Sequence, residues 1–208
     1  MKGVGGRQSG PIVSGAVADA FARRREAGLA LVECADAMSR AGAAMAARFS
    51  GGGKLIAFGN GAGSTDAQHL AVEFVHPVVV GKRTLPAIAL TSDMATISGI
   101  ADREGWEQVF AHQIQHLGRP CDIAFGFIPP DGSSGNVVRA LLVAQEMGLL
   151  TVALGRDDIG PIVAVDHTVM VKSANPQIVK EMEVTICHIL WELVHAFLER
   201  PPVGGAAR

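Results

Sequence analysis

The stretch that decides the fold is KLIAFGNGAGSTDAQHLAVEF, residues 54–74. It begins with a short apolar run typical of a buried strand, turns through Gly59, Gly61 and Gly63, and continues as an amphipathic helix. Glycines permit a sharp turn and close approach of a ligand, and the start of a helix offers free N–H groups to a phosphate. An ordinary strand-to-helix turn fits equally well, because Ser64 stands where a dinucleotide-binding motif needs glycine and no P-loop lysine follows.

The rest of the chain continues this alternation of short apolar strands and helices. Further strands are predicted in TLPAIALTSD, CDIAFGFIPP, LLTVALGRDD and HTVMVKS, and further helices in WEQVFAHQIQHLG, SSGNVVRALLVAQEMG and IVKEMEVTICHILWELVHAFLER. The alternation predicts an α/β fold in which helices cover both faces of a five-stranded parallel sheet. Ligands of such sheets bind outside the carboxyl ends of the strands, where the glycine turn and a second turn at residues 129–135 both fall.

Changes in composition divide the chain into four segments. Residues 1–10 and 201–208 are expected to be flexible ends. Residues 11–50 show the apolar spacing of a long helical segment, with a break expected near Gly28. Residues 51–200 form the α/β domain, and Ser64 or Thr65 is expected to be the N-cap of its first helix.

Composition and charge argue against several classes of function. Of the 208 residues, 49% are hydrophobic and 18% are charged, which favours a large interface between copies or a sheet covered on both faces. A net charge of −2 without a basic stripe argues against direct nucleic-acid binding. No signal peptide or membrane-spanning run is recognised, and the three cysteines lack metal-site or disulfide spacing. A cytoplasmic location is therefore expected.

Histidines and one glutamate are the candidate chemical groups. His69 and Glu73 are four residues apart on one helix face, where they either bind one metal ion or act as an orienting histidine beside a general base. A surface pair or a hydrogen-bonded core histidine fits the same spacing. His188 has apolar neighbours on the last helix, which favours an interior position. His112 and His116 are interpreted as a solvated helix face.

Four stretches carry a resemblance to a known family. They are GGGKLIAFGNGAGSTDAQHLAVEF, LPAIALTSDMATISGIADREGWEQVF, GSSGNVVRALLVAQEMGLLTVAL and the terminal ICHIL. In this order and spacing they resemble the sedoheptulose 7-phosphate isomerases (phosphoheptose isomerases) of the sugar isomerase, or SIS, superfamily, over roughly residues 38–198. The resemblance implies a flavodoxin-like αβα sandwich with a long N-terminal helical segment. It also implies a homotetramer with active sites at subunit interfaces.

The same resemblance implies roles for single residues. Glu73 and His188 are the proton-transfer pair of an aldose–ketose isomerisation through an enediol, and His69 joins them as a ligand of Zn²⁺. A zinc ion would polarise the sugar carbonyl. The sugar or sugar phosphate is expected to contact residues of both turns, of the segment before the aromatic helix and of the last helix: Asn60, Gly61, Ala62, Ser64, Asp102, Arg103, Ser133, Ser134 and Lys180.

Several positions depart from the family pattern. The family's Ser-Thr-Ser-Gly-Asn-Ser loop is matched by PPDGSS at 129–134, in which two prolines remove backbone donors and Asp131 adds a negative charge. At about 4 Å and an effective dielectric near 20, each pair of unit charges from Asp131 and a bound phosphate would repel by roughly 4 kcal/mol. The family's Gly-Gly-Ser is matched by Ala62-Gly63-Ser64, and its Asn-Asp by Asp102-Arg103. Lys180 stands in place of a glutamine, and an ammonium does not ligate zinc. A three-ligand metal site, or none, is expected.

Two functional hypotheses follow. The first is an isomerase that acts on a sugar or sugar phosphate with altered ligand recognition, which His69, Glu73 and His188 favour. The second is a non-catalytic SIS protein that binds a sugar-phosphate effector or a protein partner, which the proline-bearing loop and Lys180 favour. The first is preferred because the metal-binding and acid–base residues are retained.

Overall fold

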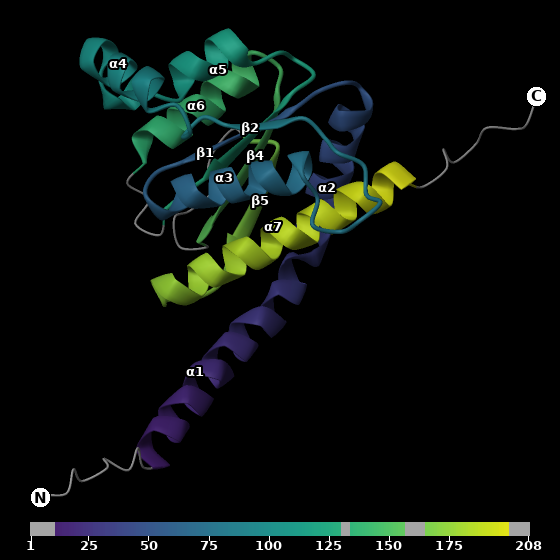
Figure 1. The fold of residues 1–208 in the computed structure, drawn as a ribbon, viewed down its shortest axis with the longest axis vertical. Coiled ribbons are helices and arrows are strands. Elements are labelled where there is room, and N and C mark those ends of the chain that lie inside the picture. The colour runs from purple at the N-terminus through teal and green to yellow at the C-terminus, as the bar shows by residue number, and fades with distance from the viewer. Residues whose placement is uncertain (1–10, 130–133, 157–164, 200–208) are drawn as a thin grey trace, which may run out of the picture.

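A five-stranded parallel sheet forms the centre of the computed structural model (Figure 1). The structure describes residues 11–129, 134–156 and 165–199. The strands are β1 (Leu55–Gly59), β2 (Ala87–Ala89), β3 (Ile123–Phe127), β4 (Leu150–Arg156) and β5 (His167–Val171), and they lie in the order β2-β1-β3-β4-β5. The predicted α/β fold with five parallel strands is confirmed.

The two central strands are buried on both faces. Every residue of β1 and β3 is buried, and their register pairs Leu55 with Ile123 at one end and Gly59 with Phe127 at the other. Strands covered on both sides do not alternate polar and apolar residues, which explains the continuous apolar runs LIAFG and IAFGF. Gly59 and Phe127 mark the carboxyl edge of the sheet, where ligands bind in such folds.

Helices form one layer on each face of the sheet. On one face, α2 (Ala35–Ser50), α3 (Ala62–Val75) and α7 (Pro176–Glu199) share a hydrophobic core with the strands. On the other face, the core is shared by α4 (Met94–Glu104), α5 (Ala111–Leu117) and α6 (Gly135–Glu146), and the short helix η2 is Trp106–Gln108. This is a three-layer αβα sandwich, in which α3 and α7 are neighbours on one face (Figure 1).

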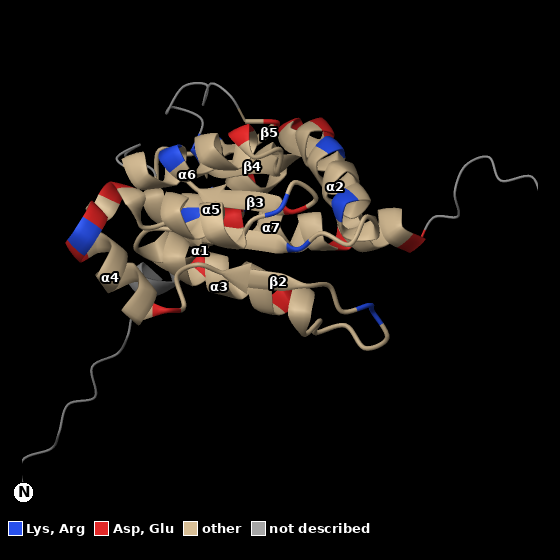
Figure 2. Ribbon diagram, turned by 90° about the horizontal axis from the view of Figure 1, so that it is seen from above, with Lys and Arg blue, Asp and Glu red and all other residues tan. Residues whose placement is uncertain are grey.

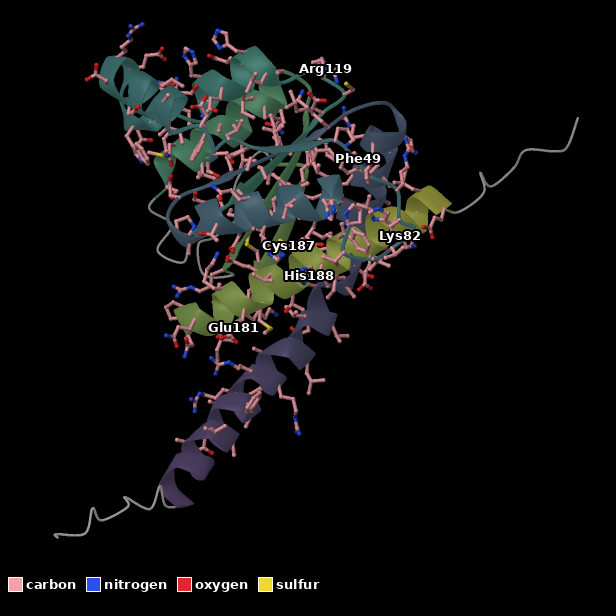
Figure 3. The ribbon with its side chains drawn as sticks, in the orientation of Figure 1. Phe49, Lys82, Arg119, Glu181, Cys187 and His188 are labelled. Atoms are coloured by element: carbon pink, nitrogen blue, oxygen red, sulfur yellow. The ribbon has the colours of Figure 1, made fainter. Side chains whose placement is uncertain are left out.

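The N-terminal helical segment contains two α-helices joined by a 3-10 turn. Helix α1 (Pro11–Ala30) continues past Gly28, and the break falls at η1 (Leu31–Cys34), so the predicted break is displaced. One glycine weakens a helix without ending it, whereas burial of Leu31 in the core fixes the turn at η1. Helix α1 projects away from the sandwich (Figure 1). Its Arg24 forms an ion pair at 2.7 Å with Glu181 of α7, and Glu181 is labelled in Figure 3.

The expected N-cap of α3 is wrong. The helix begins at Ala62 with Gly61 as its N-cap, and no side chain caps it. Gly61 has a φ of 53°, and the backbone N–H of Ser64 donates to its carbonyl at 3.0 Å. The glycine conformation therefore starts the helix before either hydroxyl residue is reached.

Helix α4 was not predicted and occupies the segment after the second strand. The carboxylate of Asp93 accepts hydrogen bonds from the N–H groups of Ala95 and Thr96, which satisfies the start of the helix. Strand β2 is correspondingly short, because the run TLPAIALTSD ends in this cap rather than in a strand.

Charged residues are scattered over the helices and connecting segments rather than gathered in one block (Figure 2). Within the described ranges, no helix is long and apolar enough to cross a bilayer.

Candidate active site

The turn between β1 and α3 is tightly packed against β3. A Cβ atom on Gly59 would lie 2.9 Å from the Cβ of Phe127, and one on Gly63 would lie 3.1 Å from the same atom. Side chains larger than hydrogen would push the turn away from the strand. The glycines therefore bring the start of α3 against the carboxyl edge of the sheet.

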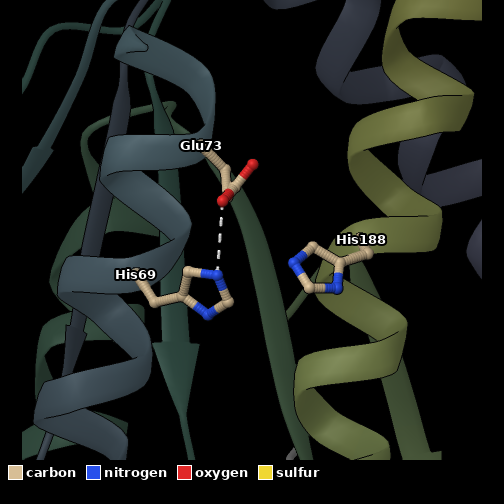
Figure 4. A group of neighbouring side chains, drawn as sticks. All are labelled: His69, Glu73 and His188. Atoms are coloured by element: carbon tan, nitrogen blue, oxygen red, sulfur yellow. Dashed lines mark ion pairs between the residues drawn. The ribbon is translucent and has the colours of Figure 1, made fainter. Parts of the chain in front are cut away.

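His69, Glu73 and His188 come together between α3 and α7 (Figure 4). The Nε2 atom of His69 lies 3.4 Å from Oε1 of Glu73, and the ring centroids of His69 and His188 are 5.1 Å apart. One donor atom of each side chain lies within 4.8 Å of the others. Two nitrogens and one oxygen are thus presented together, a donor set that suits Zn²⁺.

His188 does not occupy the interior position that its apolar neighbours favoured. Its side chain is exposed, whereas Ile186 and Cys187 are buried in the core beneath α7. Three consecutive helix residues spread over different faces, so the two apolar residues turn inward and the histidine turns toward α3. Figure 3 shows Cys187 and His188 in the middle of α7.

A hydrogen bond and an ion pair join α3 to α7 near the three side chains. The indole Nε1 of Trp191 on α7 donates to the backbone carbonyl of Glu73 on α3 at 2.9 Å. Toward the other end of α3, Lys180 of α7 forms an ion pair with Asp66. The contacts fix the separation of the helices that carry the histidines and the glutamate.

Lys180 is held by two buried carboxylates. Its Nζ pairs with Asp66 and donates to Oε2 of Glu183 at 2.7 Å. Burial alone would lower the pKa of Lys180, but its hydrogen bonds to Asp66 and Glu183 outweigh burial and raise that pKa above its usual value. Burial raises the pKa of Glu183, although Lys180 opposes the shift. The lysine is therefore a charged ammonium at neutral pH.

A small pocket of about 60 Å³ opens beside Lys180 at the carboxyl edge. It is lined by the glycine turn, the end of β3 and α7, through residues that include Asn60, Ala62, Phe127, Pro129 and Glu183. The Nδ2 atom of Asn60 donates to Oγ of Ser134 at 2.9 Å and to Oδ1 of Asn136 at 2.7 Å. These bonds tie the turn after β1 to the start of α6.

Gly61, Ser64, Asp102 and Arg103, which were also expected to contact substrate, are not among the residues that line this pocket. Gly61 is exposed and Ser64 half-buried at the start of α3. Asp102 and Arg103 are exposed on α4, in the opposite helical layer from α3 and α7. Ser133 and Asp131 lie outside the described residues. His112 and His116 lie on α5, where His112 pairs with Glu104 at 2.9 Å, in keeping with a solvated face.

Comparison with known proteins identifies the family. A profile of the SIS domain matches residues 21–155. The phosphoheptose isomerase of Solidesulfovibrio magneticus is 40% identical over 168 residues, which cover 80% of this chain and 79% of that protein. The chain belongs to the phosphoheptose isomerase family. The predicted resemblance is thus confirmed.

Solved structures of phosphoheptose isomerases share the fold. The structures of GmhA from Neisseria gonorrhoeae and of the enzyme from Francisella tularensis match with TM-scores of 0.79 and 0.80, each at 27% identity. Each match covers 88% of this chain, and 99% and 98% of the respective relatives.

Three residues around the candidate site were not predicted: Asp66, Glu183 and Trp191. Asp66 precedes His69 by three residues, and Glu183 follows Lys180 by three. Helix spacing alone would have placed each carboxylate one turn from a candidate residue. The contact of Trp191 with Glu73 joins positions 118 apart in the chain, and no local pattern announces it.

Proposed function

We propose that this protein is an isomerase that interconverts the aldose and ketose forms of a sugar phosphate, with sedoheptulose 7-phosphate as the first candidate substrate. One observation carries the proposal. A carboxylate and an imidazole face each other from α3 and α7, in a chain 40% identical to a phosphoheptose isomerase.

Glu73 is the proposed base that moves the proton between C1 and C2. Glu73 is 8% exposed, and its backbone carbonyl accepts a hydrogen bond from the indole N–H of Trp191. A base is effective when it is positioned and shielded from competing water. Across the helix interface, His188 is the proposed group that protonates the C2 carbonyl oxygen of the ketose and then removes the proton from the C1 hydroxyl, which becomes the aldose carbonyl. From α3 and α7 the two groups would act on neighbouring atoms of one enediol.

The donor set of His69, Glu73 and His188 fits a zinc ion. In a tetrahedral zinc site, ligand distances of about 2.1 Å place neighbouring donors about 3.4 Å apart. The separation of His69 Nε2 and Glu73 Oε1 is 3.4 Å. Zinc bound by these residues would polarise the sugar carbonyl. Lys180 would not be a ligand, because its ammonium is already paired with Asp66 and Glu183.

The substrate end of the site is proposed to lie at the pocket beside Lys180. Asn60, Ala62, Ser134 and Lys180 were expected to contact substrate, and all four lie at this carboxyl edge or adjoin it. Pro129 also lines the pocket and has no N–H to offer a phosphate. Phosphate recognition is therefore proposed to use the glycine turn and the start of α6.

We also propose that copies of the chain assemble, as a tetramer, through apolar surface left uncovered in one copy. On α1 and η1, Val17, Phe21, Leu29 and Val32 are 50–74% exposed. Val78, Val79 and Val80 form a second exposed apolar run after α3. Apolar patches of this kind on soluble enzymes mark protein interfaces.

The proposed function is tested by following aldose formation from sedoheptulose 7-phosphate. Purified protein is assayed as isolated, after chelation, and after reloading with Zn²⁺. We expect turnover that falls on chelation and returns with zinc. Absence of turnover under every metal condition contradicts the isomerase. Binding of the sugar phosphate without turnover would instead favour a non-catalytic SIS protein that senses the sugar.

A further inference from the structure

Two further carboxylates share the α3–α7 interface with the proposed metal ligands. Asp66 lies three residues before His69 on α3, and Glu183 lies five residues before His188 on α7. At the rise of an α-helix, these offsets are roughly 4.5 Å and 7.5 Å along the helix axes. Both residues are buried, at 8% and 2% exposure. Together with Glu73, they concentrate three carboxylates in one weakly solvated region.

Lys180 supplies a positive charge to this region. Its ammonium pairs with Asp66 and, at 2.7 Å, with Glu183, and it lies 5.9 Å from the centre of the Phe127 ring. With neutral imidazoles, the three carboxylates and the ammonium leave a formal charge of −2. One divalent cation at His69, Glu73 and His188 would therefore bring the region to neutrality.

We propose that Lys180 is a built-in counter-ion that fills a second cation position, between Asp66 and Glu183, and thereby confines a divalent metal ion to His69, Glu73 and His188. The inference rests on the proposed metal site. It follows from the pairing geometry, because a cation held between two buried carboxylates screens them from the metal. The Lys180 ammonium also opposes metal binding directly, because it repels the metal cation strongly where water is scarce.

The proposal fixes the sign of three substitutions. Lys180→Met removes the repelling charge without restoring the glutamine oxygen of the family, and it leaves Asp66 and Glu183 to attract the metal, so zinc binding should tighten. Asp66→Asn removes an attracting charge and leaves the ammonium less compensated, so zinc binding should weaken. In the double variant the two changes oppose each other, and the affinity should return toward that of the wild type.

The experiment is a zinc titration of the full-length, metal-stripped protein against a competing chelator, with no assay of activity. We expect about tenfold tighter binding for Lys180→Met, about tenfold weaker binding for Asp66→Asn, and an affinity within about threefold of wild type for the double variant. Lys180→Arg keeps the charge and should also stay within about threefold. Lys82→Met is the matched control, because Lys82 pairs at 2.6 Å with the exposed Glu199 and should not affect the metal.

The outcomes separate this inference from the proposed function. Weaker or unchanged zinc binding in Lys180→Met overturns the counter-ion. Weaker binding in both single variants is the result that a purely structural ion pair would produce. If Lys180→Met does not fold, an affinity change beyond threefold in Lys180→Arg overturns the counter-ion instead. If the zinc affinities follow the expected pattern but the protein does not isomerise the sugar, the counter-ion is supported and the isomerase is overturned. Wild-type protein that binds no zinc overturns the metal site and the counter-ion together.

Discussion

Asp122 is a fully buried carboxylate just before β3. It accepts hydrogen bonds from the backbone N–H groups of Lys54 at 2.9 Å and Arg119 at 3.0 Å, and it pairs with the ammonium of Lys54. Burial alone would raise the pKa of Asp122, but the hydrogen bonds and charge of Lys54 outweigh burial and hold that pKa below its usual value. The side chain thereby ties the start of β1 to the start of β3.

This geometry predicts how stability depends on acid. A carboxyl with a lowered pKa in the folded state stabilises the protein above its unfolded pKa of about 3.9, and the contribution is lost as pH falls through the folded value. Asp122→Asn should lower the free energy of unfolding at pH 7 by about 3 kcal/mol, because Lys54 loses its buried partner. Below about pH 4 the difference from wild type should shrink. Urea unfolding at several pH values measures both effects.

The exposed Asp102 provides the control for this comparison. Asp102→Asn should unfold as the wild type does across the pH range. The free energies of unfolding of Asp122→Asn and of the wild type are compared down to pH 2. A difference that stays constant would show that the charge of Asp122 is not what stabilises the fold.

Single site residues could be predicted from the sequence when they share a helix or a family motif. His69 and Glu73 are one helical turn apart, and the resemblance added His188 from the last helix. The pair of Lys180 with Asp66 was not predicted, because it joins positions 114 apart. Such a contact depends on how α3 and α7 pack, which local periodicity does not encode.

The turn between β1 and α3 depends on a glycine conformation. Gly61 has a φ of 53°, and no atom lies within 4 Å of a Cβ built on it. Gly61→Ala should therefore destabilise the fold by about 1–3 kcal/mol through backbone strain alone. Gly99 in α4 is equally uncrowded but helical, so Gly99→Ala should stabilise by about 0.5–1 kcal/mol. Thermal unfolding of both variants checks the opposite signs, and a neutral Gly61→Ala would contradict the account.

At the level of elements, the strands were predicted more reliably than the helix ends. The runs LIAFG and IAFGF are apolar throughout because both faces of β1 and β3 are covered. Helix α4 was missed because its Asp93 cap follows a strand closely, and the run TLPAIALTSD was interpreted as one strand. The break after α1 was misplaced because burial of Leu31, a tertiary effect, decides it.

The whole molecule leaves apolar surface that a single copy does not cover. Phe21 is 70% exposed on α1, the helix that projects from the sandwich (Figure 1). If copies pack through α1, Phe21→Ser should shift the protein from tetramer toward smaller species in sedimentation velocity. Met94→Ser, at a 66% exposed position on α4, is the control and should leave the assembly unchanged. A wild-type monomer at micromolar concentration would contradict the assembly.

The central claim is that the side chains between α3 and α7 isomerise a sugar phosphate. The most direct test is the rate of sedoheptulose 7-phosphate conversion by zinc-loaded Glu73→Gln. Glu104→Gln serves as the control, because Glu104 pairs with His112 in the opposite helical layer. We predict that Glu73→Gln loses about 10²-fold or more in kcat while Glu104→Gln keeps the wild-type rate. Equal rates for Glu73→Gln and the wild type would contradict the claim.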